Sequence, residues 1–278
     1  MFGVHVRRGL QAGALAGLAF GLLVALVANP LVGYADELAH ADGGHAEAND
    51  AHRDDAEAAH ADGDTTHQSD HHESAVSMPT TNAVSVLAGV LWGVLLGGVV
   101  FGAAFALLEP AIPGSGATRS YVLAAAGFVT VSGAPWLVLP PQPPGVEHAL
   151  ATDARIALYA AMMVAGALAC LLAGGTYRRL RARRGRVVAT TGAALSLGVL
   201  AVPALLAPSV GVSHSLPGAL ATGLTGLVVV GQALLWLLLA TVHALLRQRD
   251  RDATGGSTSD ETENAHAPGT TDGALAAD

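Results

Sequence analysis

The side chains best suited to metal chemistry are seven histidines gathered in one polar segment. Between Tyr34 and Met78 the chain carries seven of its twelve histidines and twelve carboxylates, against a single arginine. Neutral imidazole is a ligand for cobalt, nickel, copper and zinc, and carboxylate oxygens help to neutralise the cation. The segment therefore predicts binding of a divalent transition metal. Its histidines are His40, His45, His52, His60, His67, His71 and His72.

The spacing of these histidines predicts a weak and unselective binder rather than a fixed site. Successive separations are 5, 7, 8, 7, 4 and 1 residues, and only His67 and His71 stand four apart, the separation that places two side chains on one face of a helix. The segment also has too few large apolar residues to fold alone. We expect a flexible collector whose many ligands raise its apparent affinity. The alternative is a solvated polar loop without a binding role.

Two other polar loops reach a histidine by a similar route. Each leaves an apolar stretch through Pro-x-x-x-x-Pro and arrives at Gly-Val-x-His, first from Pro135 to His148 and again from Pro203 to His214. Proline ends a helix and stiffens the chain that follows it. We therefore predict that His148 and His214 form the ordered part of a metal-binding mouth, with Glu147 as an added carboxylate ligand.

Polar side chains near or inside the apolar stretches are few. His243 lies near the end of the last such stretch, and Gln232 precedes it by about three helical turns. Ionisable residues inside a membrane are energetically expensive and are usually functional. We therefore predict that Gln232 and His243 line a translocation path, although His243 is near enough to the interface to reach it. Glu109, directly before Pro110, is expected to mark the interface.

The elements that must position these residues are apolar helices. Hydrophobic residues make up 51% of the chain and charged ones only 13%, against about 25% charged in a typical soluble domain. Six stretches are long enough to cross a hydrocarbon core of about 30 Å, and none contains Asp, Glu or Arg. Pro30 is expected to end the first of them. They are Gly9–Asn29, Ala83–Leu108, Tyr121–Leu139, Ile156–Thr176, Val187–Ala207 and Gly218–Leu246.

The arginines give these stretches an orientation. All fourteen basic residues are arginine, and twelve fall on one side of a six-span arrangement. Because cytoplasmic loops carry the excess of basic residues, both termini are predicted to be cytoplasmic, in an all-α, multi-pass protein of the cell membrane made of three helical hairpins. Its predicted parts are a first transmembrane helix over 1–32, an extracytoplasmic His/Asp-rich disordered loop over 33–82, a five-helix membrane domain over 83–246 and an acidic disordered cytoplasmic tail over 247–278.

The first apolar stretch leaves two alternatives open. Arg7 and Arg8 before an apolar run could belong to a cleaved signal peptide, but the run of about 21 residues exceeds the 7–15 that are usual in a signal peptide. The repeat Gly13-x-x-x-Gly17-x-x-x-Gly21 places small residues on one helix face. Because such a strip lets two helices approach closely, it predicts a packing seam within the protein or with a partner.

The composition excludes several classes of protein. Without any lysine, the chain has neither the P-loop lysine that reaches nucleotide phosphates nor a lysine for Schiff-base chemistry. The apolar stretches hold no HExxH, no GxSxG and no pair of catalytic acids, so neither an enzyme nor an organic cofactor is expected. The run from Arg178 to Arg186 lies between two predicted spans, where contact with the lipid bilayer explains it and nucleic acid is not expected.

Several of these motifs resemble those of the CbtA family of predicted cobalt transporter subunits. They are the N-terminal Arg-Arg before a Gly/Ala/Leu-rich stretch, the His-rich first loop, the exit Pro140-Pro141-Gln142-Pro143-Pro144-Gly145 and the sequence His214-Ser215-Leu216-Pro217. The similarity covers most of residues 1–246. It implies cobalt as the transported ion, five or six spans, and a small one-span partner with its own histidines, called CbtB. The long acidic histidine loop and the tail depart from the family pattern.

The residues and the resemblance together predict a subunit of a cobalt uptake permease whose outer loop collects the cation. Nickel and zinc are the alternative ions. The runner-up function is a membrane-anchored metal sensor or buffer without transport activity. Other metal carriers fit less well, because no span contains the His-x-x-x-x-Asp-His helix of the nickel/cobalt permeases.

Overall fold

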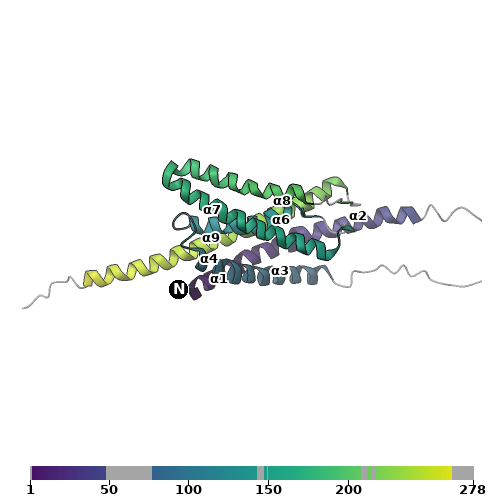
Figure 1. Ribbon diagram of the computed structural model, residues 1–278. Coiled ribbons are helices and arrows are strands. Elements are labelled where there is room, and N and C mark those ends of the chain that lie inside the picture. Colours follow the sequence, from purple (N-terminus) through teal and green to yellow (C-terminus); the bar gives the residue numbers. More distant parts are fainter. Residues whose placement is uncertain are drawn as a thin grey trace, which may run out of the picture.

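Helices make up almost all of the structure, a computed structural model that describes residues 2–47, 77–142, 147–148, 150–207, 212–213 and 217–264. The segments form long helices that lie side by side (Figure 1). They are α1 (Phe2–Leu23), η1 (Val24–Ala28), α2 (Asn29–Glu47), α3 (Met78–Val94), η2 (Leu95–Gly102), α4 (Ala103–Leu108), α5 (Thr118–Phe128), η3 (Val129–Gly133), α6 (Ala134–Trp136), β1 (Glu147–His148), α7 (Thr152–Leu197), η4 (Gly198–Leu200), α8 (Ala201–Leu206), β2 (Val212–Ser213) and α9 (Gly218–Asn264). The all-α prediction is confirmed for the described residues.

Among the described residues, four helical stretches are long and apolar enough to cross a membrane: Phe2–Leu38, Met78–Leu108, Thr152–Leu206 and Gly218–Ala253. The third stretch is not one straight rod, because Gly185 inside α7 has φ 84° and ψ −178°. The chain turns back there, in the green segment at the left of Figure 1, which gives four or five apolar passes. The predicted span Tyr121–Leu139 coincides with the consecutive segments α5, η3 and α6, which are not among the four. The count of six spans therefore stays a prediction.

The first helix is longer at both ends than the predicted span Gly9–Asn29. It starts at Phe2 and continues through η1 and α2 to Glu47, so Pro30 does not end it. A proline inside a helix lacks the N–H and clashes with the carbonyl four residues before it. Here the wider π-helical turn Val24–Ala28 ends two residues before Pro30 and makes room for the ring. Helix therefore continues into the polar segment that follows the predicted span.

Two strips of glycine hold α1 against α3 and η2. Within each strip, glycine recurs every four residues. The strip on α1 consists of Gly9, Gly13, Gly17 and Gly21, and the strip that faces it consists of Gly89, Gly93 and Gly97. A methyl group added at Gly17 would stand 2.8 Å from the Cα of Gly93, so no larger residue fits. Close approach of two backbones gives dispersion contacts where the surrounding lipid supplies no hydrophobic effect. The predicted seam is therefore an internal one.

The larger of two clusters of buried apolar side chains among the described residues lies where α9 meets α1, η2, α4 and α5. Phe101, Phe105 and Leu239 are at most 2% exposed there, and Trp236 fills the space beside Gly127 of α5. A methyl group at Gly127 would overlap the Trp236 ring. A second cluster joins α6, α7 and η4 around Met162. These contacts fix the rotation of α9, and with it the direction in which its polar side chains point.

The loops divide between the two ends of the bundle (Figure 1). One end carries the N-terminus, the bend at Gly185 and the C-terminal half of α9. The other end carries the end of α2, the start of α3 and the end of α8. α9 itself runs to Asn264, beyond the predicted end of the last span at Leu246. Below, the end of the bundle that carries the N-terminus is called the N-terminal end, and the opposite end is called the β-strand end.

Candidate functional site

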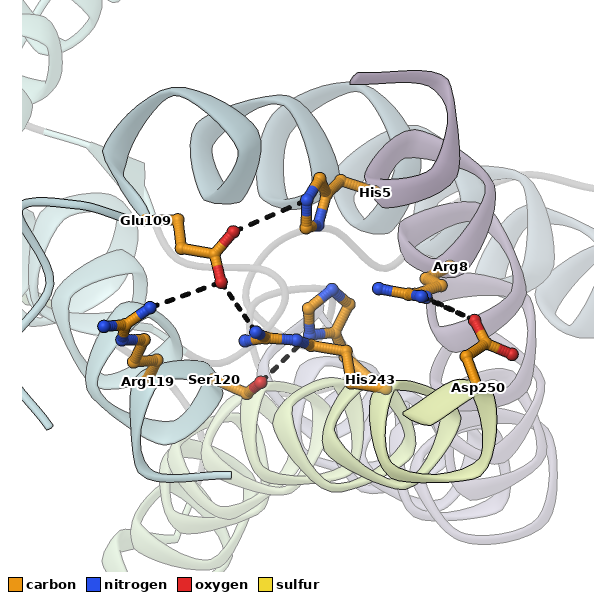
Figure 2. A network of polar contacts seen from close by, with 8 residues as sticks. His5, Arg8, Glu109, Arg119, Ser120, His243 and Asp250 are labelled. Atoms are coloured by element: carbon orange, nitrogen blue, oxygen red, sulfur yellow. Dashed lines mark hydrogen bonds and ion pairs between the residues drawn. The ribbon is translucent and has the colours of Figure 1, made fainter. Parts of the chain in front are cut away.

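A cluster of charged and polar side chains lies at the N-terminal end of the bundle (Figure 2). Its centre is the carboxylate of Glu109, which directly follows α4. Oε1 of Glu109 accepts hydrogen bonds from Nη2 of Arg247 at 2.6 Å and from Nη1 of Arg119 at 3.3 Å. Its Oε2 lies 3.5 Å from Nε2 of His5. One carboxylate thus connects α1, the end of α4, α5 and α9.

A tight turn after α4 sets the geometry of Glu109 and Arg119. Pro110 follows Glu109 and cannot continue the helix with an N–H of its own. The turn then passes through Gly114 and Gly116, whose φ angles of 100° and 56° are easily adopted by glycine and rarely by other residues. Nε of Arg119 donates a hydrogen bond to the carbonyl oxygen of Gly114 at 3.0 Å, which holds the guanidinium where it reaches Glu109.

A second ion pair joins the first and last helices beside this cluster. Nε and Nη2 of Arg8 lie 2.7 Å and 2.6 Å from Oδ2 of Asp250. Arg8 is mostly buried and Asp250 is more exposed, with side-chain exposures of 15% and 43%. The pair neutralises Arg8 and fastens α9 to α1 beyond the apolar part of the interface.

His243 and Ser120 are the two fully buried polar residues of the cluster. Nδ1 of His243 lies 3.0 Å from Oγ of Ser120 on α5. The rings of Phe101 and Phe105 pack against the His243 imidazole at centroid distances of 5.2 Å and 4.7 Å. The other imidazole nitrogen, Nε2, is buried and has no hydrogen-bond partner among the residues that the structure describes.

His5 on α1 repeats this arrangement from the opposite side. Its Nε2 faces Glu109, and its Nδ1 is buried without a hydrogen-bond partner in the described part of the chain. The imidazole stacks on Phe105, with ring centroids 5.5 Å apart and an interplanar angle of 29°. His5 and His243 therefore both rest on Phe105, and Figure 2 shows their rings in the space between α1 and α9.

Arg247 lies next to these two rings. Its guanidinium carbon stands 4.5 Å from the centroid of Phe105, a cation–π contact, and the residue is only 6% exposed. Nη2 is paired with Glu109, but Nη1 is buried without a partner among the described residues. The cation is thus held by one carboxylate and one aromatic face, with part of its hydrogen-bonding capacity unused.

The cluster holds donor atoms for a metal but is not arranged as a metal site. Within the described ranges, no group of three or more His, Cys, Asp or Glu side chains is placed to hold a metal ion. Two guanidinium groups, those of Arg119 and Arg247, share the carboxylate of Glu109, and this excess of positive charge disfavours a further cation. In this arrangement the cluster fastens helices together.

The sequence prediction found only part of this cluster. Glu109 was expected merely to mark the interface, whereas it is the residue that joins the elements. His5 precedes the predicted first span and was missed, although a helical pattern could have found it. His5 stands four residues before Gly9 and seven before Ala12, which are both buried, so it belongs to the buried face of α1. Gln232, three turns before His243, is half-buried on α9.

Most of the predicted metal-binding histidines of the first loop lie outside the described residues. His52, His60, His67, His71 and His72 belong to this group. His40 and His45 fall within helix α2, of which the structure describes the backbone at these two positions.

The two other predicted loops meet at the β-strand end. β1 and β2 pair in antiparallel fashion, with Glu147 opposite Ser213 and His148 opposite Val212. His214, the third predicted residue of this mouth, follows β2 and lies outside the described residues. The backbone pairing brings together two loops that are more than sixty residues apart in sequence.

A cavity of about 570 Å³ lies beside the start of α7. Its lining includes Trp136, Pro141, Gln142, Arg155 and Met163. The arginine and the apolar side chains do not suit a divalent cation, so this cavity is not a candidate for the metal path.

The profile of one protein family matches this chain, and the match runs over residues 3–248. The family is described as a probable cobalt transporter subunit (CbtA). No curated protein and no solved structure matches the chain.

Proposed function

The chain belongs to the CbtA family of probable cobalt transporter subunits, and from this we propose that it is a subunit of a permease that moves cobalt into the cell. The observation that carries the proposal is the family match, because residues 3–248 cover nearly all of the four apolar stretches found among the described residues. A transporter family also implies a role without catalysis. Nickel and zinc are the other ions that the same ligand types would accept.

The proposed topology has six spans with both termini in the cytoplasm. In this arrangement α5, η3 and α6 form one span and α7 contributes two on either side of Gly185. The gathering of Arg8, Arg119 and Arg247 at the N-terminal end supports it, because basic residues are retained on the cytoplasmic side. The β-strand end would then face outward, together with the polar segment after α2.

At the outer face, the His/Asp-rich segment is proposed to collect cations. Seven imidazoles and twelve carboxylates in one segment raise the local concentration of ligands, so a cation that leaves one is recaptured by another. The expected effect is on apparent affinity at low metal concentration and not on the maximal rate.

Glu147, His148 and His214 are proposed as the ordered ligands that receive the collected cation. Support comes from the register of β1 and β2, in which His148 pairs with Val212. In the sequence, His214 follows Val212 by two positions. Gln232 and His243 would line the later part of the path.

The membrane potential supplies a sufficient driving force for uptake. A divalent cation gains about 4.6 kcal/mol per 100 mV of inward-negative potential, twice the value for a single charge. The sequence has no P-loop for ATP. The family also suggests a small one-span partner with histidines of its own, like CbtB, with which the chain would act.

Uptake of radiolabelled cobalt by cells that produce the chain tests the proposal. Replacement of the seven loop histidines by serine should raise the apparent KM and leave the maximal rate unchanged, while His148→Ala with His214→Ala should lower uptake at low metal. His266→Ser in the tail is the matched control. If the complete chain, produced with its one-span partner, gives no uptake above background, it is instead a membrane-anchored sensor or buffer.

A further inference from the structure

The cavity between the chain that follows α6 and the start of α7 combines one positive charge with a long apolar wall. Its volume is about 570 Å³, within the range of pockets that bind small organic ligands. The start of α7 lies at the β-strand end of the bundle, opposite to the bend at Gly185. Ile156 in its wall is 63% exposed. A cavity with an open side at this position can take up a molecule from the surrounding bilayer.

One face of α7 forms a wall of this cavity, and its polarity changes along the helix. The lining residues of α7 are three or four positions apart, so they share one face. From Arg155 to Met163 this face is about 12 Å long, at 1.5 Å per residue. A charge near one end and apolar surface beyond it fit an amphiphile, with a charged head and a hydrocarbon tail. The lining residues of α7 are Thr152, Arg155, Ile156, Tyr159, Ala160 and Met163.

The charge at the head of this face is not neutralised by the protein. The four ion pairs among the described residues lie at the N-terminal end, and Arg155 is in none of them. Asp153, the acid nearest to it in sequence, is not among the residues that line the cavity. An arginine at the edge of a membrane attracts anionic headgroups. The head of the amphiphile is therefore expected to be an anion.

The other wall of the cavity adds a hydrogen-bond acceptor. Oε1 of Gln142 is buried and has no hydrogen-bond partner among the described residues. A buried polar atom without a partner is energetically costly, and a hydroxyl group of a ligand would remove that cost. A guanidinium and a free amide oxygen together fit a phosphate that is joined to a polyol.

The apolar part of the cavity is held in shape by contacts of its own. The hydroxyl of Tyr159 donates a hydrogen bond to the carbonyl oxygen of Val131 at 2.5 Å. Pro135, four residues after Val131, has no N–H to offer to that carbonyl. Trp136 packs edge-on against Phe128, with ring centroids 5.7 Å apart and an interplanar angle of 85°. These contacts join α7 to the segment from α5 to α6 and leave Arg155 and Gln142 as the unused polar groups.

We propose that this cavity binds an anionic phospholipid. Its phosphate lies on Arg155, a headgroup hydroxyl donates to Gln142, and an acyl chain follows the apolar face of α7 toward Met163. Phosphatidylglycerol has this chemistry, whereas phosphatidylcholine is zwitterionic and has no headgroup hydroxyl. In the proposed topology the lipid belongs to the outer leaflet. Because it contacts both walls, its binding stabilises the folded chain.

Binding can be measured on the purified full-length chain after its lipids have been removed in detergent. Dioleoyl phosphatidylglycerol or dioleoyl phosphatidylcholine is added in increasing amounts. Bound lipid is counted by native mass spectrometry, and the midpoint of thermal unfolding is recorded at each concentration. Phosphatidylglycerol should bind more tightly and raise the midpoint at a lower concentration. Glycerol 3-phosphate and inorganic phosphate, which have no acyl chains, should neither raise the midpoint nor compete.

Variants of the two parts of the cavity separate the headgroup from the acyl chain. Arg155→Gln should weaken phosphatidylglycerol binding at least about fivefold, the effect of one arginine beside an anionic lipid surface, and Arg155→Lys should retain most of the affinity. Ala160→Phe should fill the apolar part and weaken binding of both lipids. The matched control is Arg186→Gln, which removes the same charge from an exposed position at the other end of α7. Midpoints without lipid establish that each variant is folded.

Three results would overturn the proposal. Equal affinity for the two lipids would mean that the headgroup is not recognised. A loss with Arg155→Gln no larger than with Arg186→Gln would mean that Arg155 does not hold the phosphate. Stabilisation by inorganic phosphate equal to that by the lipid would mean that the cavity binds a free anion. Because no step uses cobalt, these results are distinct from a failure of uptake, which would count against the proposed function alone.

Discussion

Replacing Gly93 with alanine tests the glycine seam between α1 and α3. The added methyl group would stand 2.6 Å from the Cα of Gly17 and 2.9 Å from its backbone nitrogen, and it would overlap the carbonyl oxygen of Gly13. Carbon atoms in contact prefer separations of about 3.5–4.0 Å. All three neighbours are backbone atoms, so no side-chain rotation relieves the overlap, and the helices must move apart by roughly 1 Å.

The expected cost follows from a comparison with Gly223, which lies in α9 with nothing within 4 Å of the position of an added Cβ. In both positions alanine gains about 1 kcal/mol of helix propensity over glycine. Only at Gly93 does it also overpack the interface, which costs about 1–3 kcal/mol. Because the propensity gain is common to both, Gly93→Ala should be less stable than Gly223→Ala by about 1–3 kcal/mol.

The difference can be measured as the midpoint of thermal unfolding of the detergent-solubilised chain, followed by fluorescence-detected size-exclusion chromatography. Gly13→Ala combined with Gly93→Ala should cost less than the sum of the two single changes, because the first substitution already separates the helices. If Gly93→Ala were as stable as Gly223→Ala, the two glycine strips would not be in contact and the reasoning would be refuted.

Two further predictions concern the turn in α7 and the topology. Gly185→Ala should destabilise the chain by about 1–3 kcal/mol, because residues with a Cβ avoid the backbone conformation of φ 84° and ψ −178° even where space is open. The control is Gly175→Ala, at an equally open helical position. Equal thermal midpoints of the two variants would contradict the turn at Gly185. In a Cys170→Ser background, Ser69→Cys should react with an impermeant maleimide on whole cells and Ser259→Cys only after permeabilisation; the reverse pattern would invert the orientation.

The positions of the apolar helices could be predicted from the sequence, because hydropathy over about twenty residues is a local property. The second predicted span, Ala83–Leu108, ends where α4 ends, and the sixth begins at Gly218 with α9. The first span was predicted too short at both ends. Pro30 ends a helix in most settings, and the π-helical turn that accommodates it here gives no signal in the residue types.

The glycine seam could be predicted from the sequence only in part. The repeat of Gly13, Gly17 and Gly21 predicted a close helix contact, but it could not say with which helix. Its partner strip, centred on Gly93, has the same four-residue period. The contact depends on how two helices are rotated and crossed, which is a property of the pair.

By itself, the sequence determined the class of the protein, its apolar segments, the arginine asymmetry and the accumulation of imidazoles in one polar segment, because each of these follows from residue types along a short stretch. Only the tertiary structure decided that His5, Glu109, His243 and Arg247 meet at one end of the bundle. These residues come from three segments separated by about a hundred residues or more. For these residues to meet, the glycine seam must set the spacing of α1 and α3, and Phe105 and Trp236 must set the rotation of α9. Steric fit of this kind exists only once the helices are packed.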